Sequence, residues 1–137
     1  VRRGLADGTI DAIASDHAPH HRDGKEVEFD RALNGVVGLE TTLGLALRMV
    51  AEAKIPLDVV IAAMTAAPAR ILGLPLGTLG PGAAADITVV DPTRRWTVQA
   101  ARFHSKARNT PFEGMELQGQ AMATIVGGRI VWRAEST

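Results

Sequence analysis

Small apolar residues dominate a short run near the start of the chain. Residues 9–15, TIDAIAS, are mostly apolar, and they stand between a glycine and a polar, histidine-rich stretch. Such a run is typical of a buried strand in a parallel sheet. Pro19 disfavours a helical conformation at Ala18, so the pattern predicts that the strand ends at Asp16 and that a loop follows. The polar residues 22–35 predict a mobile connection.

Helical periodicity begins after this connection. Apolar residues recur every three or four positions over residues 39–50, and again over residues 59–67, which predicts two helices that pack on a core. Pro68 is expected to break the second helix. Gly73 is expected to cap one further short turn.

The second half of the chain is rich in β-forming residues and glycine. Pro92 is expected to stop a strand that begins at Asp86, because proline cannot donate to a sheet ladder. Gly127-Gly128 predicts the tight turn of a hairpin, because both residues can adopt positive φ angles. Strands are predicted over four segments: residues 86–91, 96–98, 123–126 and 129–132.

The change of pattern predicts an α/β chain in two parts. Residues 1–72 would form one part, with the buried strand and the helices, and residues 73–137 would form a small β-rich subdomain. No internal repeat or low-complexity segment interrupts either part.

Composition narrows the function classes. The 137 residues carry a formal net charge of zero, which gives no attraction for nucleic acid or an anionic membrane and favours a small-molecule partner. The absence of cysteine excludes disulfides, thiolate metal ligands and a cysteine nucleophile. No apolar stretch approaches the roughly 20 residues of a membrane span, so we expect a cytoplasmic protein. The first residue is not Met, and we expect the chain to be part of something longer.

The candidate chemistry gathers where the predicted strand ends. Ile10, Ala12, Ala14 and Asp16 share one face of an extended chain, which would place Asp16 at the rim of a barrel, where barrel active sites lie. A carboxylate there can ligate a cation and accept a proton. His20 could donate to an anionic substrate group, with His17 and His21 as further candidates. On spacing alone, an aspartate after a strand is more often a turn former.

Four stretches together resemble the dihydroorotase family, of the bacterial type, and they cover nearly the whole chain in order. The first, DAIASDHAPH, contains Asp16 and His20. A pattern in residues 77–87 is shared with many amidohydrolases and carries less weight. The four stretches are residues 11–20, 35–41 (GVVGLET), 67–74 (APARILGL) and 105–114 (SKARNTPFEG).

The resemblance implies a fold and a set of site residues. The chain would be the C-terminal portion of a metal-dependent hydrolase with a TIM barrel, containing its last strand and helices, followed by the β-rich subdomain. Asp16 would be a metal ligand and the catalytic proton carrier, for one or two zinc ions whose other ligands lie upstream. His20 would bind the substrate carboxylate, and the backbone of Asn34 and Gly35 would contact the substrate. The family usually has Ala-Pro-Phe-Gly where this chain has residues 32–35, ALNG.

The implied activity is the reversible hydrolysis of dihydroorotate to N-carbamoyl-L-aspartate in pyrimidine synthesis. A homodimer and an association with aspartate transcarbamoylase both stay open as partners. Because the His-x-His pair, the carboxylated lysine, the further histidine ligands and the substrate-binding arginine of the family would lie upstream, we expect the chain alone to be inactive and poorly stable.

Two other functions are weighed against this one. Allantoinases and dihydropyrimidinases share the Ser/Thr-Asp-His opening, but generally carry another residue at the position of His20. A non-catalytic dihydroorotase-like scaffold of aspartate transcarbamoylase tends to lose metal ligands, and this chain keeps Asp16. We interpret His104 as a surface or loop-packing residue, the two tryptophans as packing residues, and residues 106–109 as a structured loop that joins the β-rich part to the rest.

Overall fold

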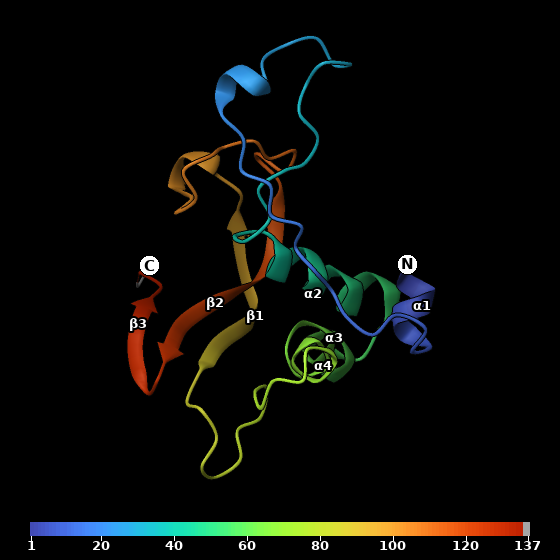
Figure 1. Cartoon of the computed structure of the whole chain (residues 1–137), viewed down its shortest axis with the longest axis vertical. Helices are drawn as coiled ribbons and strands as arrows, with labels where there is room; N and C mark the ends of the chain where they lie inside the picture. The colour runs from blue at the N-terminus through green and yellow to red at the C-terminus, as the bar shows by residue number, and fades with distance from the viewer. Residues whose placement is uncertain (136–137) are drawn as a thin grey trace.

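The structure is a computed structural model and describes residues 1–135. Helices precede strands along the chain, as the pattern predicts (Figure 1). None of the helices in these residues is both long and apolar enough to cross a membrane. The elements are α1 (Arg2–Ala6), the 3-10 helix η1 (Arg22–Gly24), α2 (Thr42–Ala53), α3 (Leu57–Met64), α4 (Ala66–Ile71), β1 (Ile87–Thr97), the 3-10 helix η2 (Ala100–Arg102), β2 (Glu116–Val126) and β3 (Arg129–Arg133).

The helices α2 and α3 confirm the two predicted helices, with different ends. Leu39, expected on the first helix, lies before α2 and is 64% exposed. The second helix ends at Met64, because the backbone of Thr65 (φ −133°, ψ −84°) leaves the helical region. Pro68 therefore does not break a helix, and that prediction was wrong. It lies in the first turn of α4, where a missing N–H costs no intrahelical hydrogen bond.

The predicted cap at Gly73 is confirmed. Gly73 has a φ of +65°, its N–H donates to the carbonyl of Arg70 (3.1 Å), and the N–H of Leu74 donates to the carbonyl of Ala69 (2.9 Å). This pair of bonds is the Schellman motif, which satisfies the last carbonyls of a helix and requires a left-handed residue.

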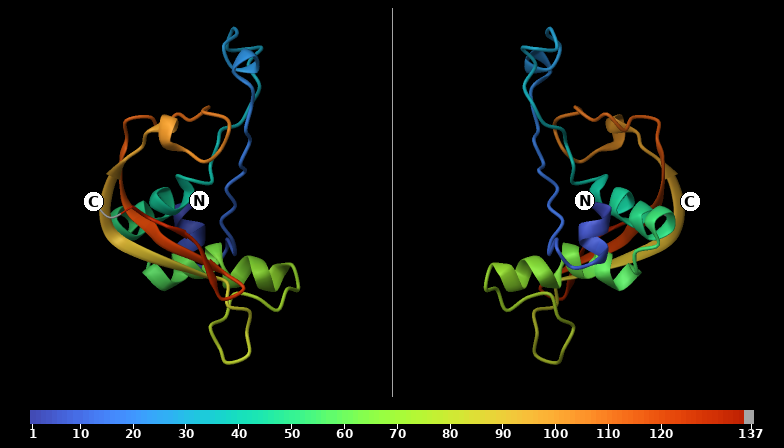
Figure 2. Two further views of the ribbon diagram at one scale, coloured as in Figure 1. Left: turned by 90° about the vertical axis from the view of Figure 1, so that its left-hand side faces the viewer. Right: turned by 90° about the vertical axis from the view of Figure 1, so that its right-hand side faces the viewer.

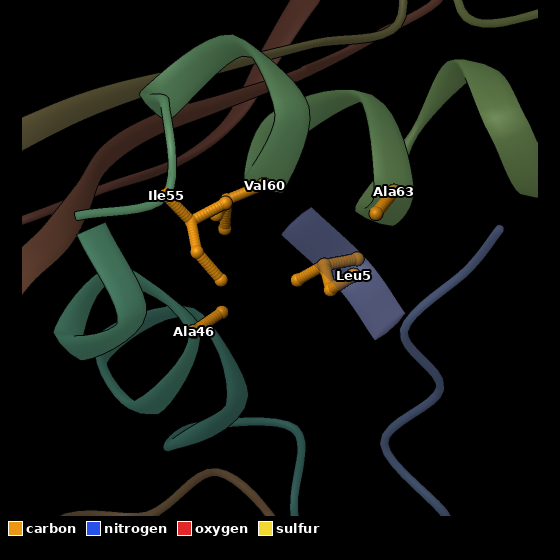
Figure 3. Close-up of a cluster of buried hydrophobic side chains, with 5 residues drawn as sticks. All are labelled: Leu5, Ala46, Ile55, Val60 and Ala63. Atoms are coloured by element: carbon orange, nitrogen blue, oxygen red, sulfur yellow. The ribbon is translucent and has the colours of Figure 1, made fainter. Parts of the chain in front are cut away.

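Three helices form the first of two hydrophobic cores. Figure 3 shows how the side chains of α1, α2, α3 and the α2–α3 connection converge on one small volume. All five members are at most 3% exposed, and Met49, Val50 and Ile13 pack around them. The five are Leu5, Ala46, Ile55, Val60 and Ala63.

The second core lies between α2 and the sheet. Its buried members are Val37, Val98, Phe103 and Leu117, and Leu45 of α2 packs against them. The helix and β2 approach closely because glycines stand at the contact. A Cβ on Gly44 would lie 3.1 Å from Leu117, and one on Gly119 would overlap Leu47.

The sheet has three antiparallel strands in the order β1-β2-β3. The predicted hairpin is confirmed, since β2 and β3 are joined by Gly127 (φ +55°) and Gly128 (φ +76°). Both tryptophans lie on the sheet, and Trp96 packs in the second core and donates from Nε1 to the carbonyl of Gly119 (3.0 Å).

The expected stop at Pro92 was wrong. β1 continues from Ile87 to Thr97 through a register shift between Asp91 and Arg95. Asp91 Oδ1 accepts hydrogen bonds from Thr93 N (2.8 Å), Thr93 Oγ1 (2.7 Å) and Arg94 N (3.1 Å). This local turn absorbs the proline in a bulge, so residues 96–98 belong largely to β1 rather than to a separate strand.

Residues 9–15 do not form the predicted strand. They are extended, but the nearest pairing in the described chain is an isolated bridge between His17 and Val36. Ile13 N instead donates to the carbonyl of Ala63, at the C-terminal end of α3 (2.9 Å). A strand needs a neighbour for its ladder, and within residues 1–135 the space beside this segment is filled by a helix.

The segment leads into an arm that projects from the helices and the sheet (Figure 2). The tip of the arm exposes apolar side chains, and Phe29 is 99% exposed. The chain has a surface of 9528 Å², whereas a compact monomer of 14.5 kDa has about 6,900 Å². The predicted mobile connection is an arm with turns and η1, held by specific contacts described below.

Candidate functional site

Asp16 stands at the turn between the extended segment and the arm. Its φ of +44° is one of two positive values among the non-glycine residues described. Aspartate tolerates this left-handed conformation better than most residues. The turn leaves the carboxylate exposed at the end of the extended segment, where it can reach a cation or a proton.

His17 fastens the base of the arm. Its Nδ1 accepts a hydrogen bond from the N–H of Gly38 (3.1 Å), with the N–H of Leu39 at 3.5 Å. An accepting Nδ1 carries no proton, so Nε2 is the ring nitrogen left for a ligand. His21, the other further candidate, lies further along the arm, where its Nδ1 accepts from the N–H of Asp23 (3.3 Å).

The structure brings the three predicted substrate residues together. His20 Nε2 and the carbonyl oxygen of Asn34 are 2.7 Å apart, so Nε2 donates and Nδ1 is left for a ligand. Gly35 follows with a φ of +101°, and a Cβ there would lie 2.6 Å from the Cβ of Ala18. Glycine is therefore required at this position by both backbone conformation and space.

Lys25 and Asn109 hold this cluster from two sides. Lys25 Nζ donates to the carbonyls of Leu33 (2.6 Å) and Gly35 (3.1 Å). Asn109 Nδ2 donates to the carbonyls of Ala18 (2.9 Å) and Gly35 (3.2 Å). Sequence reasoning placed Asn109 in a structured joining loop, and the structure confirms that position and adds these contacts, which no local pattern indicates.

Glu40 ties the same loop to the start of α2, and sequence reasoning missed it. Its carboxylate accepts from Ser105 N (2.8 Å) and Ser105 Oγ (3.0 Å). Partial burial raises the pKa of Glu40, but the two hydrogen bonds from Ser105, together with a backbone hydrogen bond of Glu40 itself and the nearby His17, lower it overall. The loop over residues 105–109 is thus anchored at both ends. His104 beside it is exposed, which favours the surface residue of the two predicted alternatives.

The described residues supply too few ligands for a metal centre of their own. Within residues 1–135 no three His, Asp, Glu or Cys side chains gather closely enough to hold an ion. A catalytic zinc site takes three protein ligands, and the exposed carboxylate of Asp16 can supply one.

Comparison with known proteins defines the class. The amidohydrolase family matches residues 1–131, and the chain belongs to that family. It is 52% identical over 134 residues to a dihydroorotase of Citrifermentans bemidjiense, covering 98% of this chain and 32% of the relative. It is 56% identical over 133 residues to a dihydroorotase of Geobacter metallireducens, covering 97% and 31%. The chain therefore spans about a third of the length of these relatives, and the predicted resemblance is confirmed.

Solved structures agree on the fold. An L-hydantoinase (dihydropyrimidinase) from Arthrobacter aurescens superposes with a TM-score of 0.90 at 32% identity, over 99% of this chain and 32% of the other. A D-hydantoinase (dihydropyrimidinase) from a Thermus species gives a TM-score of 0.87 at 28% identity, over 96% and 30%. The predicted fold class, an α/β portion of an amidohydrolase that ends in a small sheet, is confirmed.

Proposed function

We propose that this chain is a portion of a dihydroorotase, which hydrolyses dihydroorotate reversibly to N-carbamoyl-L-aspartate in pyrimidine synthesis. The observation that carries the proposal is the 52% to 56% identity to dihydroorotases along almost the whole chain. The solved hydantoinases share the fold at 28% to 32% identity. That lower identity makes a carboxylate-free cyclic amide the weaker candidate substrate.

In this proposal residues 1–72 complete a TIM barrel contributed mostly by other residues of the protein, and residues 73–137 are its β-rich subdomain. Three features support this. The extended residues 9–15 have an unfilled ladder, the chain exposes far more surface than a compact protein of its mass, and the arm presents Phe29 to solvent. All three features are expected of a barrel portion whose neighbouring strands belong to another part of the protein.

Asp16 is the proposed catalytic residue and one metal ligand. A divalent cation, for which we propose zinc, would polarise the ring carbonyl when bound with ligands from outside this chain. The carboxylate of Asp16 would take the proton of the attacking water and pass it to the departing ring nitrogen. Its position at an exposed turn allows both transfers without movement of a packed element.

His20, Asn34 and Gly35 form the proposed pocket for the substrate carboxylate. His20 would donate from Nδ1 when its ring carries both protons, and the backbone N–H groups of Asn34 and Gly35 donate to no protein group within residues 1–135. A chain without net charge has to bind an anion through such local donors. Neutral rings such as hydantoin lack the group that this pocket would hold.

The wider setting is also part of the proposal. We propose a cytoplasmic enzyme with a small-molecule substrate and with neither nucleic acid nor membrane as a partner, which the balanced charge supports. A homodimer and a complex with aspartate transcarbamoylase are the two candidate assemblies, and size measurement of the complete protein with and without that enzyme distinguishes them.

The test is turnover by the complete, metal-loaded protein that contains these residues. We expect ring opening of dihydroorotate and ring closure of carbamoyl aspartate, with hydantoin and dihydrouracil at least a hundredfold slower. Asp16→Asn should reduce kcat by at least a hundredfold, the usual range for a general acid–base, and the pocket variants should act mainly on KM. Faster turnover of hydantoin than of dihydroorotate would contradict the proposal, and so would full activity of Asp16→Asn.

A further inference from the structure

Asn109 joins the second half of the chain to the proposed substrate pocket. Its side-chain amide makes three hydrogen bonds, in which Oδ1 accepts from the N–H of His20 (3.3 Å) and Nδ2 donates to the carbonyls of Ala18 (2.9 Å) and Gly35 (3.2 Å). Its own backbone carbonyl accepts from the N–H of Val37 (3.0 Å). Both N–H groups and the oxygen of the amide are therefore engaged.

The atoms that Asn109 holds belong to the two segments that carry the pocket. One segment contains Ala18 and His20, and the other contains Gly35 and Val37. The segments are distant from residue 109 in the sequence, with 91 positions between Ala18 and Asn109 in the hydrogen-bonded pair. Other contacts also join the two segments: the N–H of Ala18 donates to the carbonyl of Val36 (2.9 Å), and the N–H of Gly38 donates to His17 Nδ1 (3.1 Å). Among these contacts, the amide of Asn109 is the one that binds the backbone of both Ala18 and Gly35.

The hydrogen bonds to carbonyls also set the direction of the free N–H groups. In a trans peptide the C=O and the next N–H point in opposite directions within one plane. The bond from Lys25 to the carbonyl of Leu33 (2.6 Å) therefore orients the N–H of Asn34. The bond from His20 to the carbonyl of Asn34 (2.7 Å) orients the N–H of Gly35.

Asn109 restricts the two backbone groups of this arrangement that could still move, the carbonyl of Gly35 and the N–H of His20. It holds the carbonyl of Gly35 together with Lys25, and it holds the backbone N–H of His20, whose ring aligns the peptide before Gly35. We propose that Asn109 is a positioning residue for the substrate carboxylate, through which the β-rich half of the chain acts on substrate affinity. This inference rests on the proposed function.

A purely structural role for Asn109 predicts a different result. If the amide only clasps two segments, its loss lowers the stability of the protein, and substrate affinity and turnover fall together or not at all. If Asn109 instead orients the donors that bind the substrate carboxylate, which does not react, its loss weakens binding of the ground state and the transition state equally. KM then rises while kcat is retained.

The experiment compares Asn109→Ala with the wild type and with Gln118→Ala in the complete, metal-loaded protein. Gln118 is a matched control, because its amide also donates to a distant backbone carbonyl, that of Pro92 (3.2 Å), but on the exposed side of the sheet. We expect Asn109→Ala to raise KM for dihydroorotate at least tenfold, with kcat changed less than threefold and metal content unchanged. Gln118→Ala should keep the wild-type values.

Asn109→Asp keeps the side-chain shape and serves where the alanine variant does not fold. It retains the acceptor for His20 and presents an oxygen to two carbonyls, so KM should rise in this variant too. A wild-type KM in either folded variant overturns the inference, as does a loss of kcat in proportion to the rise in KM. A wild-type protein that leaves dihydroorotate intact overturns the proposed function and this inference together, and that outcome is seen before any variant is made.

Discussion

Substitution of Gly35 by alanine tests the geometry of the pocket most directly. The φ of +101° at this position is strained for a residue with a side chain, and the new Cβ would lie 2.6 Å from the Cβ of Ala18. Carbon atoms in contact prefer about 3.5–4.0 Å, so the backbone has to move by roughly 1 Å. The left-handed conformation costs about 1–3 kcal/mol and the overlap about 1–3 kcal/mol.

The loop can relieve this strain by turning the peptide of Gly35 away from the pocket. The backbone N–H of Gly35 then points away from the substrate carboxylate, and a hydrogen bond to a charged group contributes about 1.5–3 kcal/mol. We expect KM for dihydroorotate to rise at least tenfold, which corresponds to about 1.4 kcal/mol. The assay is steady-state kinetics of the complete protein, with urea unfolding measured in parallel.

Two variants separate the causes. Gly82→Ala has a similar φ of +82° but no neighbour within 4 Å of its Cβ, so it should cost stability of about 1–2 kcal/mol at most and leave KM unchanged. Ala18→Gly combined with Gly35→Ala removes the overlap and should recover part of the affinity. An unchanged KM in Gly35→Ala, or no recovery in the double variant, would refute the reasoning.

Two further predictions concern packing and pH. Gly119→Ala should destabilise the protein by about 2–5 kcal/mol, because its φ is +94° and the new Cβ overlaps the buried Leu47. Gly114→Ala is the control, since Gly114 has a positive φ but open space around its Cβ. Equal denaturation midpoints for the two variants would exclude the overlap as a cause of instability. The lowered pKa of Glu40 stabilises the folded chain above the ordinary glutamate pKa of about 4.3, and this contribution is lost as the pH falls through the folded value. From roughly pH 5 to pH 3, a range around that pKa, the wild type should therefore lose stability more steeply than Glu40→Gln. Parallel profiles of unfolding free energy against pH would contradict the role of the Ser105 contact.

Features that depend on a few neighbouring residues could be predicted from the sequence. The helix spacing over residues 39–50 and 59–67, the cap at Gly73 and the turn at Gly127-Gly128 were identified because helix burial, left-handed caps and tight turns follow from short-range geometry. The four family stretches also identified the family, because their order along the chain is itself a sequence property.

Features that depend on a distant partner were decided by tertiary structure. Residues 9–15 have the pattern of a strand, but a strand needs a neighbouring strand to pair with. In the described chain α3 lies beside this segment and accepts a hydrogen bond from its backbone. Pro92 predicts the end of a strand, yet the local turn at Asp91 places the proline in a bulge, and β1 continues its pairing with β2 beyond it.

The candidate site divides in the same way. Motifs in the sequence identify Asp16, His20, Asn34 and Gly35 as candidates, since each lies in or beside a recognisable stretch. No motif indicates the contacts of Asn109 with Ala18, His20 and Gly35, because hydrogen bonds to backbone groups leave no mark on the residues that provide them. Sequence thus determined which groups carry the proposed chemistry, and the tertiary structure decided what holds them in place.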